Sequence, residues 1–231
     1  RTADKLLSAA ERQDVIRYLA ENPKAGDLME GTGGVRKLRW GRGGQGKSGG
    51  VRVIYYFHDE AMPLYLLTLF AKGDRANLSK AERNELAEQI LALPNLKHGG
   101  NKACYLPGPD MVILPHRSSF EQDDFYYATG YHETCHWTGH PDRLNRVFGT
   151  RFGDLGYAFE ELVAEIGAAF LGAHTGISFE NMRHPEYIHH WLQILQGDSK
   201  AIFTAAAKAQ QAADFVLDKV GIISVQEETL P

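Results

Sequence analysis

The sequence has little that points to an extracellular or membrane-bound protein. Its 231 residues include only two cysteines, Cys104 and Cys135, which are too few for a disulfide framework and fit a reducing compartment. The best apolar run, residues 63–71, is too short to span a bilayer, and we expect no signal peptide. These absences predict a cytoplasmic protein that does not use a membrane as a partner.

An excess of positive charge is also lacking. Lys and Arg number 25 against 29 Asp and Glu, and the net charge of −4 predicts no general attraction to nucleic acid. Any contact with nucleic acid therefore has to be local. The hydrophobic content of 43% suffices for one good core or two small ones.

The segment HETCHWTGH at 132–140 carries the clearest chemical signal. On a helix, His132 and His136 project from the same face, and Glu133 lies beside them. Two imidazoles and a third ligand would hold Zn²⁺ with one position open for water, and Glu133 would take a proton from that water during attack on a carbonyl. The pattern therefore predicts a zinc-dependent peptidase.

The flanking residues favour a helix over residues 121–138. Ser119 and Gln122 form an expected capping box before it, and Gly139 followed by Pro141 ends it.

The third metal ligand has two candidates. Counted onward from His132, Asp142 falls where the extended metzincin pattern has its third ligand. In a second expected helix, Glu161 and Glu165 lie one turn apart, so one could bind the metal and the other accept a proton from a ligand histidine. Because the apolar residues around them would bury this helix, unpaired carboxylates there would be costly. We therefore prefer Glu161 as the ligand and Glu165 as its outer partner, with Asp142 as the alternative.

Longer motifs surround this site. They are Tyr105, Asp110 and Pro115, then HETCHWTGHPDRL at 132–144, FGDLGYAFEELVAEIGAAFL at 152–171 and YIHHWLQILQGDSKAIFTAAAKAQQAADFVL at 187–217. From about residue 99 to residue 220 the chain thereby resembles the zincin-like metallopeptidase domain of the ArdC antirestriction proteins, also found in plasmid primases and phage polyvalent proteins. The resemblance implies a gluzincin-like site, which supports Glu161. The family's usual N-terminal single-stranded-DNA-binding domain is not visible, so DNA binding is not carried over.

The first half of the chain predicts a small α+β unit with an antiparallel sheet. We expect helices over 3–20 and 79–93 and strands over 35–40, 51–58 and 64–71. The loop 41–50 contains GRGGQGKS, which satisfies the Walker A spacing. A strand follows it where a phosphate-binding loop needs a helix, so we reject a nucleotide site.

A basic run without acidic residues lies between residues 31 and 58. Its cations are Arg36, Lys37, Arg39, Arg42, Lys47 and Arg52. With Trp40, Tyr55 and Tyr56 interleaved, these strands could hold RNA by phosphate contacts and stacking.

The same half contains NPKAGDLMEGTGGVRKLRWGRGGQGKSGGVRVIYYF at 22–57 and LLTLFAKGDRANLSKAE at 66–82. In these segments residues 4–92 resemble the HigB/RelE toxins of type II toxin–antitoxin systems, without their first strand. The resemblance implies a ribosome-associated mRNA endonuclease that uses cationic side chains and no metal, with an antitoxin as a partner. The candidates for RNA binding or cleavage are Arg36, Lys37, Arg39, Arg52, Tyr55 and Lys72.

In the second half we expect strands over 102–106 and 111–114 and further helices over 157–172, 185–196 and 199–220. The two strands are where a peptide substrate would add as an extra strand. Tyr157 or Tyr187 could stabilise an oxyanion.

The sequence thus predicts an α+β protein with two domains. Residues 1–93 form a HigB/RelE-like domain with a small antiparallel sheet, and residues 98–224 form a mainly helical zincin-like metallopeptidase domain with a short sheet, joined directly by residues 94–98. The favoured function is zinc-dependent peptide hydrolysis in mobile-element or antirestriction biology, next to an RNA- or ribosome-binding module. The alternative is a ribosome-dependent mRNA endonuclease with a structural or inactive zinc domain, and a third interpretation is a protein whose halves only bind partners.

Overall fold

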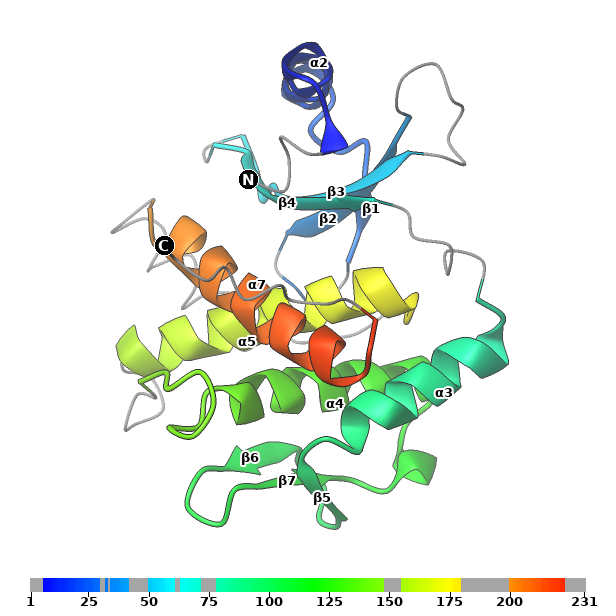
Figure 1. Ribbon diagram of the computed structural model, residues 1–231, viewed down its shortest axis with the longest axis vertical. Helices are drawn as coiled ribbons and strands as arrows, with labels where there is room; N and C mark the ends of the chain where they lie inside the picture. The colour runs from blue at the N-terminus through cyan, green and yellow to red at the C-terminus, as the bar shows by residue number, and fades with distance from the viewer. Residues whose placement is uncertain are drawn as a thin grey trace, which may run out of the picture. The chain divides into compact units, whose positions relative to one another are not determined.

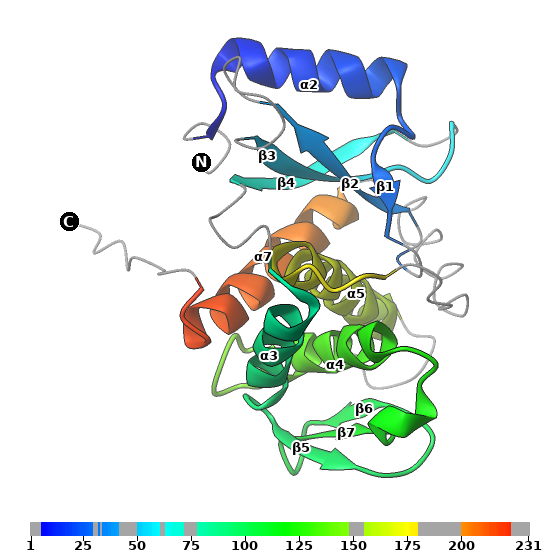
Figure 2. The same cartoon turned by 90° about the vertical axis from the view of Figure 1, so that its right-hand side faces the viewer.

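A computed structural model of the chain describes residues 6–29, 32, 34–41, 50–60, 63–71, 78–147, 155–179 and 200–222 (Figures 1 and 2). Its contacts divide the chain into two compact units. The first comprises Arg1–Ser79 with Phe179–Ile188, and the second comprises Lys80–Ser178 with His189–Pro231. Both combine helices with a small sheet, so the expected α+β class is confirmed.

Helix α2 (Ala9–Glu21) of the first unit begins at a capping box. The Ser8 N–H donates to Glu11 Oε2 at 2.9 Å, and Ser8 Oγ accepts from the Glu11 N–H at 3.3 Å. These bonds satisfy two backbone N–H groups at the helix start, so α2 begins at Ala9 and not at residue 3. Val15 and Leu19 on this helix are buried.

The sheet of the first unit is antiparallel with the order β1-β2-β3-β4. Its strands are β1 (Asp27–Leu28), β2 (Val35–Trp40), β3 (Val51–Tyr56) and β4 (Tyr65–Ala71). Leu38, Val53 and Tyr55 on one face pack with Val15 and Leu19 of α2 into a core. The three longer strands match the expected ones, whereas β1 was not expected.

The second unit packs four described helices with a second sheet. The helices are α3 (Lys80–Leu91), α4 (Asp123–Thr138), α5 (Leu155–Thr175) and α7 (Ala201–Lys219). In the sheet, β7 (Met111–Leu114) lies between β5 (Asn95–His98), which is parallel to it, and β6 (Cys104–Leu106), which is antiparallel. Helix α4 lies between this sheet and helices α5 and α7 (Figure 2).

Two local expectations in this unit are wrong. Residues 95–98 are not a bare connection, because they form β5 and pair with β7. The capping box of Ser119 and Gln122 is absent, because Ser119 ends a 3-10 turn (Arg117–Ser119) and Gln122, the N-cap of α4, makes no side-chain cap bond. Gly139 ends α4 as expected, its N–H donating to the His136 carbonyl at 2.8 Å.

Some expected features lie outside the described residues: the loop residues 42–49, Lys72, Tyr187 and the helix over 185–196. Strand β3 does begin at Val51, directly after that loop. The contacts divide the chain before α3, whereas we placed the boundary at residue 93, so the boundary itself stays a prediction. None of the described helices is long and apolar enough to cross a membrane.

Candidate metal centre

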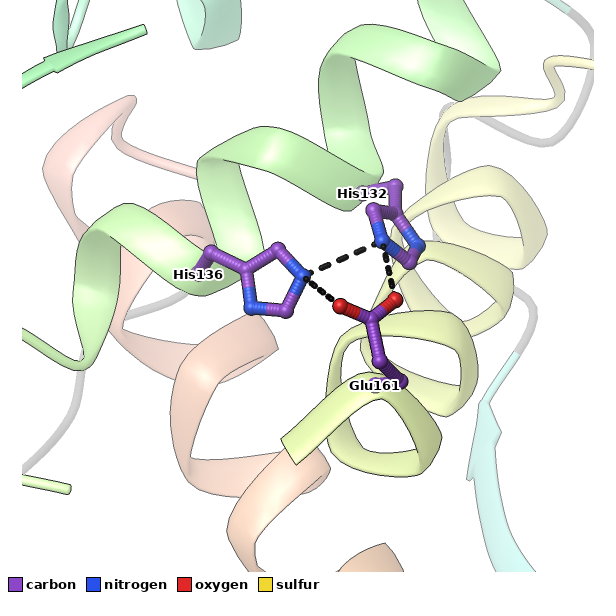
Figure 3. Close-up of side chains that lie close together, drawn as sticks. All are labelled: His132, His136 and Glu161. Atoms are coloured by element: carbon purple, nitrogen blue, oxygen red, sulfur yellow. Dashed lines mark hydrogen bonds and ion pairs between the residues drawn. The ribbon is translucent and has the colours of Figure 1, made fainter. Parts of the chain in front are cut away.

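Helix α4 and helix α5 bring two histidines and a carboxylate to one point (Figure 3). His132 and His136 lie one turn apart on α4, and their Nε2 atoms are 3.1 Å apart. Glu161 of α5 reaches between them: its Oε2 lies 3.3 Å from His132 Nε2 and its Oε1 lies 3.5 Å from His136 Nε2. One ligand atom from each residue falls within 4.8 Å of the others.

Each histidine also contacts a carboxylate through its other ring nitrogen. His132 Nδ1 lies 2.9 Å from Glu165 Oε2, and His136 Nδ1 lies 3.2 Å from Glu160 Oε1. A proton on Nδ1 that is donated to a carboxylate leaves the Nε2 lone pair for the centre. This arrangement fixes the ring orientation, and it favours the tautomer with the proton on Nδ1, which is the one that a metal ligand needs.

The electrostatics of the cluster follow from burial and these contacts. Burial alone would lower the pKa of both histidines, but hydrogen bonds to carboxylates outweigh it. His132 bonds to Glu161 and Glu165, and His136 bonds to Glu160 and Glu161. They raise the pKa of His132 and raise that of His136 to about 9. Burial alone would likewise raise the pKa of Glu161, whereas its bonds to the two histidines hold it below its usual range.

Glu133 lies on α4 next to strand β6. Its side chain is 7% exposed, and this burial raises its pKa against the lowering effect of the two histidines and of a backbone hydrogen bond from Tyr105. Burial and the nearby Glu133 charge also raise the pKa of Cys104, the neighbour of Tyr105 on β6. Glu133 thus sits between the histidine pair and an edge strand of the sheet.

The other predicted residues of this half are less close to the cluster. Asp142 follows the helix, its side chain is 87% exposed, and it lies 3.6 Å from His140 Nδ1. Tyr157 is partly buried one turn before Glu161 on α5. Of the described residues, only His132, His136 and Glu161 form a group with the spacing of metal ligands.

A family model described as zincin-like metallopeptidase matches residues 84–208, which is more than half of the chain. The chain belongs to this family. A second model, the RelE toxin of the RelE/RelB toxin–antitoxin system, matches residues 6–98. Both resemblances expected from the sequence are thereby confirmed, and the two matches overlap over residues 84–98, which include most of α3 and all of β5.

Two curated relatives match the zincin-like part. DNA primase TraC of Escherichia coli is 46% identical over 136 residues, which make up 58% of this chain and 13% of the primase. The uncharacterized protein y4eC of Sinorhizobium fredii is 42% identical over 142 residues, 60% of this chain and 46% of that protein. The chain therefore spans less than half the length of either relative.

Two solved structures of the antirestriction protein ArdC from plasmid R388 have a similar fold. The Mn(II)-bound form gives a TM-score of 0.53 at 28% identity and covers 77% of this chain and 71% of that one. The metal-free form gives the same TM-score of 0.53 at 26% identity, and the match covers 88% of this chain and 76% of that one.

The toxin-like candidates of the first unit separate into two sets. Lys37, Arg39 and Arg52 share the sheet face opposite α2, since Arg39 pairs with Arg52 in register and Lys37 is two residues away on β2. Arg36 and Tyr55 share the other face and are tied to backbone. Arg36 Nη1 donates to the Gly26 carbonyl at 2.8 Å, and the Tyr55 hydroxyl, on a fully buried ring, donates to the Pro23 carbonyl at 2.9 Å.

Sequence reasoning missed two residues at the metal centre. Glu160 contacts His136, and Arg146 pairs with Glu160 at 2.8 Å. The signal for Glu160 was the pair of adjacent glutamates on α5. The sequence cannot show that both of them reach α4, because that depends on the rotation of the helix. The segment that holds Arg146 gave no comparable signal.

Proposed function

We propose that this zincin-like chain binds a divalent cation, with zinc preferred, through His132, His136 and Glu161, and that it hydrolyses peptide bonds there. One observation carries the proposal. Two imidazole Nε2 atoms and a buried carboxylate converge, while the Nδ1 atom of each imidazole contacts a further carboxylate. A histidine that binds a metal usually donates its other ring N–H to a carboxylate, a backbone carbonyl or water, and both histidines here have a carboxylate in that place.

The donor set fits this ion. Two imidazole nitrogens and one carboxylate oxygen are the set that catalytic zinc sites use when a fourth position stays open. The site buries one ligand carboxylate, Glu161, against two imidazole nitrogens, and a dication would accept a lone pair from all three ligands at once. The Mn(II) bound by ArdC, whose fold is similar, supports a divalent ion in this chain as well.

The bound ion would polarise a peptide carbonyl and lower the pKa of water. Glu133 is the residue to accept the proton from that water, because α4 places it beside the ligands and burial raises the pKa of its carboxylate toward that of a usable base. Strand β6 is an edge of its sheet and contacts Glu133 through Tyr105, so it is the edge on which an extended peptide would align. Tyr157 is the candidate to stabilise the oxyanion.

The biological setting is part of the proposal. The relatives include a plasmid antirestriction protein and a primase, which supports a role in the transfer or defence of mobile DNA. A protein of the recipient cell is then the class of substrate to test first.

A second activity is favoured by the first unit. The match to the RelE toxin and the three cations on one sheet face support contact with RNA or the ribosome. Burial, Arg52 and Arg39 lower the pKa of Lys37, and Asp27, the register partner of Lys37, raises it. Cations that depress each other's pKa are stabilised by an approaching polyanion.

The peptidase proposal is tested by Glu133→Gln, with Glu85→Gln on the exposed side of α3 as the matched control. Zinc content is measured in each purified chain, and cleavage is followed by mass spectrometry on a peptide library from a bacterial proteome. We expect wild type and both variants to hold about one zinc per chain. Cleavage should fall roughly 10²–10⁴-fold in Glu133→Gln alone and disappear with a chelator. Wild-type protein without zinc, or Glu133→Gln cleaving at the wild-type rate, would overturn the mechanism.

A further inference from the structure

A buried ion pair lies directly behind His136. Arg146, in the segment after α4, is 6% exposed, and Glu160 of α5 is 4% exposed. Arg146 Nε donates to Glu160 Oε2 at 3.0 Å, and Nη2 donates to Oε1 at 2.8 Å. Two parallel bonds of this kind fix the carboxylate in orientation as well as in position.

The same guanidinium is anchored to the last turn of α4. Its Nη1 donates to Thr138 Oγ1 at 2.8 Å, and its Nη2 donates to the Cys135 carbonyl at 2.6 Å. Arg146 thus ties the end of the helix that carries His136 to the helix that carries Glu160. The carboxylate oxygen that receives the shorter bond, Oε1, is also the one that lies 3.2 Å from His136 Nδ1.

The two histidines differ in this respect. Glu165 holds His132 at 2.9 Å, and among the described residues no arginine pairs with Glu165. Four carboxylates lie buried around the centre, those of Glu133, Glu160, Glu161 and Glu165. Arg146 offsets one of these charges, and it does so at the carboxylate behind His136.

We infer that Arg146 is a positioning residue of the metal centre: through Glu160 it sets the orientation from which His136 offers Nε2 to the ion. The inference rests on the proposed metal site. Arg146 bonds to Glu160, Thr138 and the Cys135 carbonyl and to none of the three candidate ligands, so its effect has to appear in how tightly and in what geometry the ion is held.

The test uses the full chain and Co²⁺ or Zn²⁺ alone as the probe. Arg146→Gln should weaken metal affinity about 10–100-fold and change the visible spectrum of the cobalt-loaded protein, because His136 then loses its fixed orientation. Arg143→Gln is the matched control. Arg143 lies in the same segment and also holds α4, donating to the Trp137 carbonyl at 2.6 Å, but it pairs with Asp110 and not with Glu160.

Two further variants keep the test decisive if Arg146→Gln fails to fold. Arg146→Lys retains the positive charge but cannot make the two parallel hydrogen bonds to Glu160. Its metal affinity should fall between those of the wild type and Arg146→Gln. Glu160→Gln should weaken affinity by a similar factor, and the double variant should lose little more, because both changes act on His136 through one path. Wild-type affinity and spectrum in Arg146→Lys and Glu160→Gln would overturn the inference while leaving the peptidase proposal intact. A wild-type chain that binds neither ion would overturn both.

Discussion

The two units of this chain organise their charged groups in opposite ways. In the first unit, Lys37, Arg39 and Arg52 lie side by side on one sheet face, and their mutual repulsion is only partly offset by Asp27. In the second unit the charged groups of the metal centre are buried and converge on one point, where carboxylates lie next to the two histidines.

This difference indicates the kind of ligand that each unit can bind. Cations spread over a sheet face are complemented by an extended polyanion, whose attraction is screened by salt. Carboxylates and imidazoles directed at one point are complemented by a compact cation, whose binding depends on ligand geometry and on the protonation of the ligands. One unit is therefore expected to respond to ionic strength and the other to chelators.

The largest effect is expected from removing a ligand of the second unit. Glu161→Gln should lose more than the roughly 100-fold in zinc affinity that the loss of an outer partner costs, because a charged ligand atom disappears. Asp142→Asn should retain the wild-type affinity, since that carboxylate is 87% exposed beside His140. Zinc titration against a competing chelator measures both. If Asp142→Asn loses zinc and Glu161→Gln does not, the site belongs to the metzincin type.

The next effect concerns the first unit. Replacing Lys37 and Arg39 by Gln should weaken binding to RNA and reduce the slope of log affinity against log salt by about two units, roughly one for each lost phosphate contact. Arg17→Gln is the matched control, because this cation lies on α2, and its side chain is 69% exposed beside Asp14. Filter binding with a single-stranded RNA at several salt concentrations gives the slope. Equal slopes in the wild type and the double variant would contradict an RNA-binding face.

Much of this fold could be predicted because its signals are local. The strands β2 and β3 follow from their β-branched and aromatic residues, and the end of α4 follows from Gly139. Glu161 was preferred because it lies one turn from Glu165 on a helix expected to be buried. Strand β5 was missed because its four residues contain one apolar side chain, and its pairing with β7 depends on tertiary contacts.

Sequence reasoning named Glu165 as an outer partner, but Glu160 and Arg146, which lie behind His136, could not be predicted for a related reason. Both Glu160 and Glu161 contact the histidines, and which ring nitrogen each of them reaches depends on the rotation of α5 against α4. That rotation is set by packing of the apolar residues of both helices. Arg146 reaches Glu160 from an irregular segment, for which no period exists. The likeness to known families supported His132, His136 and Glu161 as candidate ligands, but it carried no information about Glu160 or Arg146.

A smaller effect is expected in the acid stability of the second unit. Burial of His174 on α5 lowers its pKa to about 4, so the folded state binds fewer protons than the unfolded state below about pH 6.5. The stability from this neutral histidine is present above that pH and is lost as the pH falls toward 4. His136 acts in the opposite direction: its raised pKa contributes stability below about pH 6.5 that is lost as the pH rises toward 9.

Urea unfolding of the metal-free chain at pH 7 and pH 4 tests this. The loss in free energy of unfolding on acidification should be smaller in His174→Gln than in the wild type by about 2 kcal/mol. Because His136 is present in both proteins, its own contribution cancels when the two losses are compared. The same loss in both proteins would show that His174 does not carry the acid sensitivity.

The smallest effect is expected at the helix starts of the two units. In the sequence, both α2 and α4 are preceded by a serine that is followed three residues later by Glu or Gln. Ser8→Ala should lower the free energy of unfolding by about 1 kcal/mol, because Ser8 Oγ accepts the Glu11 N–H in the capping box of α2. Ser119→Ala should change it by less than about 0.5 kcal/mol, since Ser119 makes no cap bond to α4 and is exposed. Urea unfolding at pH 7 compares both variants with wild type. An equal loss in the two would mean that Ser119 stabilises α4 after all, and that the sequence pattern described that helix start correctly.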